Sequence, residues 1–462
     1  MRDPGNEVDK MGEPMEEDDF PADLPKFNRY SYAMVNQCQR KLLPIQLEAL
    51  ESLRRWFDFH SQDGQIALVW MPTGSGKTGI ICCLPYFLGT EGLQYVPGNF
   101  PIGRPRHSFD KPVLIISPNL NISDHLQEQM LRSHLPGSQK NFFLRYGIVN
   151  EEQALRALPE GKKIESAAEL NSPYYLKGNE VIIANAQKFL KEETWEACLP
   201  NDMFKLVIVD EAHHHPARTW KRIIAKFRGH SLVVFFTATP YRGDKKLVVQ
   251  PPFAYELRLA RAIRDRIIRK TKFVEVTGQP RGVIKFRTED PEDRQKCHIF
   301  LTILEKVREI QEAKDRETPL PNNIPHMAFA IAKDQVHANL VAEVWNASWK
   351  DAPVITYTSE TKSDLPEKLL KIRTNQVRLV VVVDMLQEGF DHPPVSICAI
   401  MTNIGSPVKF VQFIGRGQRI VRDSQGNLES DTINAHIVTH QNFQQAENYD
   451  KFCKDELLFV ND

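Results

Sequence analysis

The chain lacks the features of a metal cluster and of a membrane protein. Its 7 cysteines are scattered without a C-x-x-C pair, so the spacing excludes the usual zinc and iron–sulfur ligand sets. No apolar run approaches the about 18 residues that a membrane helix needs, and the N-terminus resembles neither a signal peptide nor an Arg-rich transit peptide. These absences predict a soluble intracellular protein with reduced thiols and no membrane contact, in either cytoplasm or nucleus.

Net charge is also lacking, because 59 Lys and Arg residues balance 59 Asp and Glu residues. The first 23 residues are nevertheless strongly acidic, which leaves the rest of the chain mildly basic. That excess permits a polyanionic partner without demanding one. We expect residues 1–30 to form an acidic disordered tail.

Two series of short apolar runs divide the chain of 462 residues, which is too long for one hydrophobic core. Val, Ile and Leu runs that alternate with longer mixed segments are typical of parallel sheets with helices on both faces. The predicted fold class is therefore α/β, with two similar domains in tandem. The predicted units are a domain 1 at 31–245, a connecting segment at 246–290, a domain 2 at 291–440 and a C-terminal tail at 441–462.

A phosphate-binding loop follows the apolar run Ile66–Trp70. Successive backbone N–H groups of such a glycine-containing loop point at phosphate oxygens, and the following helix adds its positive N-terminal end. Lys77 is expected to reach the β- and γ-phosphates of ATP, and the Thr78 hydroxyl is expected to hold Mg²⁺. Met71 stands where the general motif has its first glycine. The predicted ATP-binding residues here are Thr73, Gly74, Ser75, Gly76, Lys77 and Thr78.

A second motif ends the apolar run Leu206–Val209 with two carboxylates, Asp210 and Glu211. Ligands of open α/β sheets bind at the carboxyl ends of the strands. Alternation along an extended chain predicts that the two acids point differently. Asp210 can then hold hydrated Mg²⁺ while Glu211 orients and deprotonates the attacking water.

Together, Pro72–Thr78 and Asp210–His213 resemble the motifs of superfamily 2 helicases and translocases. The text from Asp210 to Ala217 and from Phe236 to Asp244 is similar to the branch that contains the motor subunit of type III restriction enzymes. The resemblance covers about Leu43 to Val438. It implies two RecA-like domains with ATP in the cleft between them.

The resemblance also assigns roles to residues outside the two main motifs. Gln46 is expected to read the adenine edge, and His213 to bridge the ATP site to domain 2. Val383–Asp391 is similar to the fifth motif and Gln412–Arg419 to the sixth. These motifs add Gly389 and Asp391 to the nucleotide-binding residues, and Gln412, Arg416 and Arg419 to the catalytic ones.

We expect both arginines to approach the γ-phosphate from one face of a helix, since they lie three residues apart. Thr237 and Thr239 are expected to carry the signal between the ATP site and the domain connection. Nucleic acid is expected to cross both domains and to be contacted mainly at its phosphates. The predicted contact residues are Ser117, Asn119 and Asn185.

The sequence thus predicts an ATP-driven helicase or translocase that uses ATP and Mg²⁺. Duplex DNA is the favoured partner and RNA is an alternative, and targeting is left to a protein partner. Two other functions stay open: an ATP-gated nucleic-acid clamp or sensor without unwinding, and the motor subunit of a restriction-type nuclease.

Overall fold

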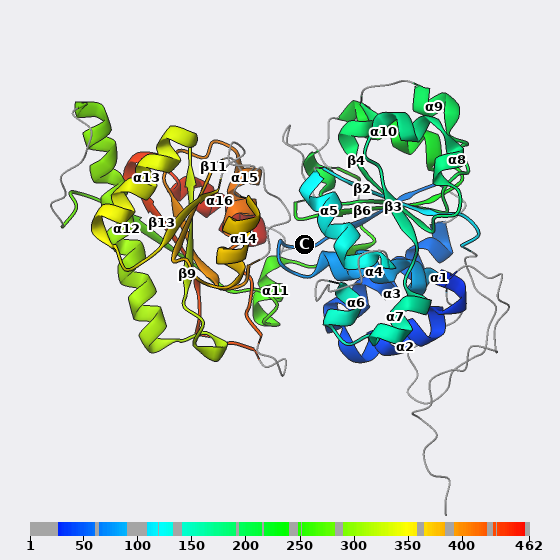
Figure 1. Ribbon diagram of the computed structural model, residues 1–462, viewed down its shortest axis with the longest axis horizontal. Coiled ribbons are helices and arrows are strands. Elements are labelled where there is room, and N and C mark those ends of the chain that lie inside the picture. The colour runs from blue at the N-terminus through cyan, green and yellow to red at the C-terminus, as the bar shows by residue number, and fades with distance from the viewer. Residues whose placement is uncertain are drawn as a thin grey trace, which may run out of the picture.

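The computed structural model consists of two α/β bodies side by side, joined through the region of α11 (Leu259–Arg264) (Figure 1). It describes residues 26–60, 64–89, 109–118, 120–132, 141–190, 194–214, 217–239, 248–250, 252–281, 290–357, 365–383, 392–422, 428–430 and 432–457. Most of the predicted acidic tail lies outside these residues, as do Asn119, Gly389 and Asp391. None of the described helices is long and apolar enough to cross a bilayer.

The first body is built on a parallel sheet whose strand order is β3-β4-β2-β5-β6-β1-β7. Nearly all residues of its central strands are buried, as expected for a sheet covered on both faces. Five apolar runs in this part of the chain predict strands, and all five are present: Ile66–Trp70, Val113–Ser117, Val181–Ala184, Leu206–Val209 and Leu232–Phe236. In chain order the strands are β1 (Ile66–Trp70), β2 (Val113–Ser117), β3 (Gly161–Lys163), β4 (Val181–Asn185), β5 (Leu206–Val209), β6 (Leu232–Thr237) and β7 (Tyr255–Glu256).

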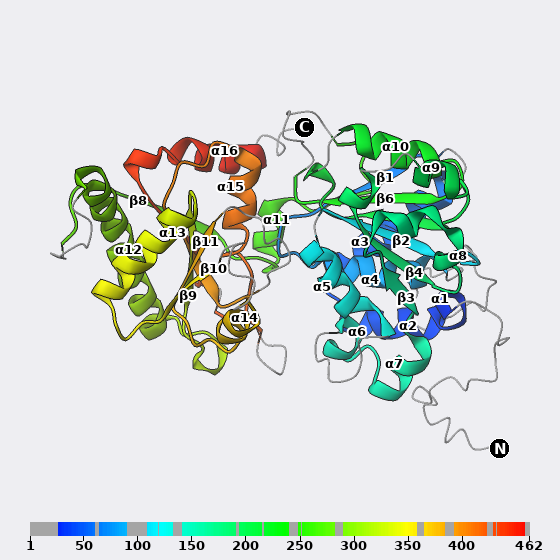
Figure 2. The same cartoon turned by 45° about the horizontal axis from the view of Figure 1, so that its top comes forward.

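Helices cover the two faces of this sheet in separate layers (Figure 2). Alternate strand residues pack into two apolar clusters, since successive side chains point to opposite faces. One face carries α1 (Lys26–Arg29), α2 (Ser31–Lys41), α3 (Pro44–His60), α4 (Lys77–Leu88), α5 (Leu120–Met130), α6 (Phe142–Arg145) and α7 (Glu151–Ala157). The other carries α8 (Pro173–Leu176), α9 (Thr194–Cys198) and α10 (Ala217–Phe227), with the 3₁₀ turns η3 (Ala167–Asn171) and η4 (Ala186–Phe189).

The second body has a six-stranded parallel sheet in the order β10-β11-β9-β12-β13-β8. Five apolar runs predict strands here, and all are present within a residue or two at their ends: Met327–Ile331, Val354–Tyr357, Leu379–Val383, Ser396–Met401 and Asn434–Val438. In chain order the strands are β8 (Thr271–Val276), β9 (Met327–Ala332), β10 (Val354–Tyr357), β11 (Leu379–Val383), β12 (Val395–Ile400) and β13 (Ala435–His440).

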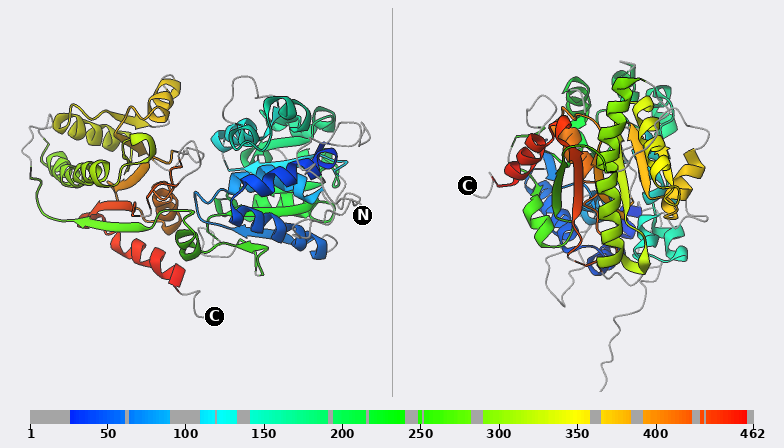
Figure 3. Two further views of the ribbon diagram at one scale, coloured as in Figure 1. Left: turned by 90° about the horizontal axis from the view of Figure 1, so that it is seen from below. Right: turned by 90° about the vertical axis from the view of Figure 1, so that its left-hand side faces the viewer.

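Two long helices cover one face of this second sheet and three shorter ones the other (Figure 3). The first layer consists of α12 (Pro291–Glu317) and α13 (Gln335–Ser348), and the second of α14 (Leu365–Arg373), α15 (Pro407–Ile414) and α16 (Ala446–Leu457). The start of α12 is well specified locally, because Asp290 accepts hydrogen bonds from the backbone of Glu292 and Asp293 while Pro291 occupies the first helical position. Two tandem RecA-like domains are thus present.

The segment expected only to connect the domains, 246–290, also contributes strands to both sheets. β7 pairs with β1 in the first sheet, and β8 pairs with β13 in the second. β8 is half-buried along its length and mixes polar with apolar residues, so it carries no apolar run that would reveal it as a strand. The chain crosses from one domain to the other between β7 and β8.

The expected C-terminal tail differs from the structure over most of its length. Helix α16 packs against α15, with Phe452 buried and the ring of Tyr449 stacked on Phe273 at 4.8 Å between centroids. The expected N-terminal tail likewise includes α1, whose Phe27 is buried. Helix α16 is amphipathic, and in both segments only packing partners distant in sequence make the apolar side chains part of the core.

Candidate ATP and interdomain site

The phosphate-binding loop lies between β1 and α4, at the carboxyl edge of the first sheet. Gly74 and Gly76 have φ angles of +81° and +89°, which an L-residue adopts only with strain. The loop also keeps a buried hydroxyl oxygen, Oγ1 of Thr73, without a hydrogen-bond partner among the described residues. A bound phosphate would satisfy such a donor, so the loop fits the polyphosphate of a nucleotide.

Lys77 begins α4 and is almost fully buried in the loop. Its ammonium donates to the carbonyl oxygens of Met71 at 3.2 Å and Pro72 at 3.3 Å, so the charge is held over the loop that it follows. The Ser75 hydroxyl also donates to the Pro72 carbonyl, at 2.6 Å. The predicted phosphate ligands are therefore gathered in one cradle.

Gln46, predicted to read adenine, lies directly behind this cradle on α3. Its Nε2 donates to the Gly76 carbonyl at 2.9 Å, and its Oε1 accepts the Leu43 N–H at 2.9 Å. A Cβ atom added at Gly76 would approach Gln46 Nε2 to 2.6 Å, so this close packing requires glycine. Gln46 is thus positioned by the loop, while its contact with a base stays a prediction.

The two carboxylates follow β5 at the same edge of the sheet. Asp210 is buried, and its Oδ1 accepts the Glu211 N–H at 2.9 Å. Glu211 has a φ of +47°, a strained value for a residue with a side chain. The expectation that strand alternation separates the two acids is wrong, because β5 ends at Val209 and this backbone turn re-aims Glu211 instead.

Thr237, the last residue of β6, connects the phosphate loop with residues Asp210–His213, called here the acidic segment. The strand order places β6 between β5 and β1. The Thr237 carbonyl accepts the Met71 N–H at 3.0 Å, and its hydroxyl lies 2.8 Å from Nδ1 of His213 and 2.5 Å from the Thr239 carbonyl. The two threonines and the histidine predicted to couple the site are therefore joined by hydrogen bonds.

His213 also reaches the second domain, where Gln412 lies on α15. Its Nε2 is 2.6 Å from the Gln412 amide nitrogen, and both side chains are buried. With the Thr237 hydroxyl proton on the Thr239 carbonyl, Nδ1–H donates to Thr237 and Nε2 accepts from Gln412. Glu211 Oε2 lies 3.6 Å from Nδ1, so the histidine touches both the acidic segment and the other domain.

The second domain brings Arg419 to the phosphate loop on the segment Gly415–Arg419, called here the arginine loop, which also contains Arg416. A Cβ added at Gly74 would lie 2.9 Å from Arg419 Cγ, and one added at Gly415 would lie 2.8 Å from Thr73 Cβ. The two loops are therefore in close contact across the domain boundary. This placement assembles groups that sequence spacing alone could not bring together.

The prediction that both arginines share one helix face is wrong. Helix α15 ends at Ile414, Arg416 lies in the turn that follows, and Arg419 forms an isolated antiparallel bridge with Ile268. Glycines at 415 and 417 permit this tight exit, because Cβ atoms there would meet Thr73 and Cys398 Sγ. Arg419 consequently reaches the phosphate loop from a bridge of extended backbone.

The expected nucleic-acid contacts Ser117 and Asn185 are brought together but turned inward. They face each other in the register of β2 and β4, at the same sheet edge as the ATP site. Ser117 Oγ is fully buried, 2.7 Å from Ser123 Oγ, and the Asn185 side chain accepts the Gln187 N–H at 2.7 Å. In this structure the two side chains therefore order the ends of the strands.

Buried thiols lie behind the phosphate loop, a feature that the sequence analysis did not single out. Cys83 on α4 is 3.5 Å from Cys38 on α2, sulfur to sulfur. Burial raises the pKa of the Cys83 thiol well above its ordinary value, which keeps it protonated. These cysteines act as small apolar side chains in the packing of α2 against α4.

Comparisons with known proteins show what the chain is similar to. Residues 39–242 match the family described as "Type III restriction enzyme, res subunit". The chain is 26% identical over 288 residues to the DNA 3'-5' translocase XPB2 of Sulfurisphaera tokodaii, a match that covers 52% of this chain and 60% of that protein. It therefore spans less than two thirds of that relative's length.

Solved structures share the fold. The helicase Lhr of Mycobacterium smegmatis, bound to single-stranded DNA and AMP-PNP, aligns over 90% of this chain and 47% of its own, with a TM-score of 0.52 and 13% identity. The type ISP restriction-modification enzyme LlaBIII, bound to DNA, aligns over 86% of this chain and 27% of its own, with a TM-score of 0.52 and 15% identity.

Proposed function

Because the chain carries the tandem RecA-like motor of the superfamily 2 helicases, we propose that it hydrolyses ATP to move along nucleic acid, with duplex DNA as its track. One observation carries the proposal: the arginine loop of the second domain lies against the phosphate loop of the first, with Arg419 Cγ 2.9 Å from where a Gly74 Cβ would be. ATP hydrolysis in this arrangement depends on the relative position of the two domains.

The residues of the first domain divide the chemistry between them. The phosphate loop and Lys77 bind the phosphates, and Thr78 with Asp210 would hold Mg²⁺, which neutralises phosphate charge when bound. Glu211, whose backbone has a positive φ, orients the attacking water and takes its proton. Phosphoryl transfer needs mainly positioning and charge compensation, and these groups supply both.

The second domain supplies the remaining positive charge. Arg416 and Arg419 neutralise charge that develops on the γ-phosphate, a role worth roughly 10³- to 10⁵-fold in rate for an arginine finger. The chain Gln412–His213–Thr237–Thr239 gives that domain a hydrogen-bonded link to the acidic segment. A change in the position of the second domain would therefore change the position of His213, which lies beside Glu211.

DNA is favoured as the track because one relative is named a DNA translocase and two structures of the same fold are bound to DNA. The DNA would lie across the carboxyl ends of β2 and β4, where Ser117 and Asn185 are paired. Since these side chains are buried, we expect the DNA to contact the chain just beyond the two strand ends, and Asn119 stays a predicted contact. Such contacts with phosphates are independent of base sequence.

Two alternatives remain within the same family. A clamp or sensor would hydrolyse ATP without displacing a strand. The motor subunit of a restriction-type nuclease is favoured by the match of residues 39–242, and it would move DNA for a cleaving partner. Strand-displacement and cleavage assays, with and without added partner subunits, separate these alternatives from a helicase.

The test is ATP hydrolysis by the purified chain alone and with single-stranded DNA, duplex DNA or RNA, at one fixed low salt concentration. We expect stimulation by DNA, greatest with the duplex. Lys77→Ala should abolish turnover, because the loop then lacks the charge that faces the phosphates, while the circular dichroism spectrum stays unchanged. Normal hydrolysis by this variant would refute the site, and indifference to every polymer would refute the motor.

A further inference from the structure

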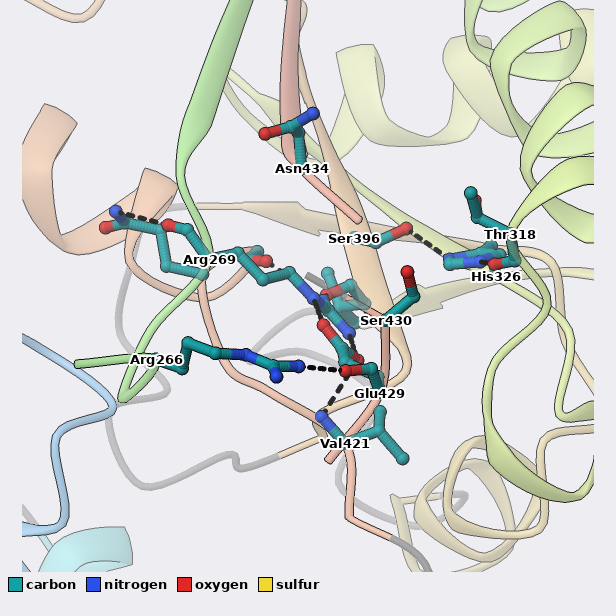
Figure 4. A network of polar contacts seen from close by, with 12 residues as sticks. Arg266, Arg269, Thr318, His326, Ser396, Val421, Glu429, Ser430 and Asn434 are labelled. Carbon is teal, nitrogen blue, oxygen red and sulfur yellow. Dashed lines mark hydrogen bonds and ion pairs between the residues drawn. The ribbon is translucent and has the colours of Figure 1, made fainter. Parts of the chain in front are cut away.

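A fully buried ion pair lies where the chain crosses between the domains. Arg269 and Glu429 have side-chain exposures of 0% and 2%. They form a bidentate pair, with Nε to Oε1 at 2.5 Å and Nη2 to Oε2 at 2.6 Å (Figure 4). Burying two charges is costly unless every donor and acceptor is used, so the remaining partners of the pair indicate what it holds in place.

Two of those partners, Gly417 and Gln418, belong to the arginine loop, and a third, Val395, begins β12. The third guanidinium nitrogen, Nη1 of Arg269, donates to the Gly417 carbonyl at 3.0 Å and the Val395 carbonyl at 2.6 Å. The backbone of Arg269 also exchanges bonds with Gln418: its N–H donates to the Gln418 carbonyl at 2.6 Å, and its carbonyl accepts the Gln418 side-chain amide at 3.2 Å. Ile268, the preceding residue, bridges Arg419.

Glu429 holds the other end of the same segment. Its Oε2 accepts the Val421 N–H at 2.9 Å, two residues beyond Arg419. Its backbone carbonyl accepts Nη2 of Arg266 at 2.5 Å (Figure 4). The carboxylate therefore ties the exit of the arginine loop to the interdomain crossing.

The crossing itself is anchored to the first domain. Leu257 is buried, and its N–H donates to the carbonyl of Trp70, the last residue of β1, at 2.8 Å. Arg261 on α11 pairs with Glu48 on α3, Nη2 to Oε1 at 2.8 Å, two residues along that helix from Gln46. A rotation of one domain against the other must bend the chain close to Arg269.

We propose that Arg269 and Glu429 are positioning residues that fasten the arginine loop to the interdomain crossing. Movement of the crossing then carries Arg416 and Arg419 toward or away from the phosphate loop as one unit. Neither member of the pair belongs to the phosphate loop or to the arginine loop, so each acts only through the segments it holds. The inference rests on the proposed function for its effect on catalysis, but the fastening itself is a property of the structure and can be measured without turnover.

The variant that tests it is Arg269→Lys. A lysine keeps a positive charge beside Glu429, but a single ammonium cannot replace a planar guanidinium that donates to the carboxylate and two carbonyls. Arg378→Lys is the matched control, since Arg378 binds Asp315 at 2.5 Å in the same domain, on the side of α12. Arg266→Met is a milder second variant, which removes only the bond to the Glu429 carbonyl.

The first readout is amide hydrogen exchange in the full chain without nucleotide. We expect Arg269→Lys to speed exchange at the amides of Arg269 and Val421 by about tenfold or more, because their acceptors are Gln418 and Glu429. Arg266→Met should give a smaller effect in the same segments. Arg378→Lys should leave both amides unchanged. Equal exchange in Arg269→Lys, Arg378→Lys and the parent chain would overturn the proposal.

The second readout is steady-state ATP hydrolysis with DNA. We expect kcat of Arg269→Lys to fall by roughly 10- to 100-fold, part of the factor of an arginine finger, with KM for ATP within about threefold. Arg378→Lys should keep the kcat of the parent chain, even if its melting temperature falls as much as that of Arg269→Lys. A kcat loss that only follows the unfolded fraction would mean a structural role and refute the positioning role. A parent chain without ATPase activity refutes the proposed function, and the exchange result still decides the fastening.

Discussion

Replacing Gly74 by alanine tests whether the close contact between the two loops matters for turnover. The added Cβ would lie 2.9 Å from Arg419 Cγ, closer than such atoms approach, so the arginine must move away from the phosphate loop. The residue also has a φ of +81°, which adds backbone strain. A loss of activity could come from the displaced arginine or from the backbone strain, so a control with the strain alone is needed.

Gly178 provides the control for strain, because it has the same φ of +81° with nothing within 4 Å of an added Cβ. Left-handed backbone costs an L-residue roughly 1–2 kcal/mol, so both alanine variants should lose about that much stability. Only Gly74→Ala should lose activity. Full removal of an arginine finger costs roughly 10³- to 10⁵-fold, and we expect partial displacement to lower kcat by about 100-fold.

A double-mutant cycle attributes the loss to the arginine. We expect Gly74→Ala to lower kcat strongly in the parent chain and little in an Arg419→Ala background, since the displaced group is already missing. The assay is DNA-stimulated ATP hydrolysis, with thermal unfolding of each variant alongside. The reasoning is refuted if Gly74→Ala is as active as Gly178→Ala, or if its full effect persists without Arg419.

Two further predictions concern the interdomain histidine and a buried histidine of the second domain. Gln412→Leu removes the partner 2.6 Å from His213 and should lower kcat by roughly tenfold in steady-state ATPase assays, with KM for ATP nearly unchanged; an unaltered kcat would contradict the coupling role. Burial lowers the pKa of His326 to about 4, and its neutral ring bonds to Ser396 Oγ and the Thr318 carbonyl. Since the unfolded chain gains this proton near pH 6.5 and the folded chain only near pH 4, stability should fall as pH drops between these values, by roughly 3 kcal/mol. His326→Gln should flatten that part of the profile in chemical denaturation, and an unchanged slope would refute the assignment.

Much of the fold followed from local sequence. Apolar runs of four to six residues, such as Leu206–Val209, predicted each strand buried on both faces, because such strands must be apolar throughout. Edge strands that are short or half-buried carry no such run, which is why β3, β7 and β8 were missed. Helix α16 was mistaken for a tail, since its apolar face only has meaning beside Phe273.

For the site, the sequence by itself determined which chemical groups are present: a glycine loop with Lys77, paired carboxylates and a motif with two arginines. Each is recognisable because its chemistry needs neighbouring residues. Tertiary structure alone decided how these groups meet. The hydrogen bond between His213 and Gln412, and the bonds from Arg269 to the arginine loop, join residues that are distant in sequence. The direction of Glu211 depends on a backbone turn, seen in its positive φ. Spacing along a chain carries no information on such contacts, because they are set by the packing of two domains against each other.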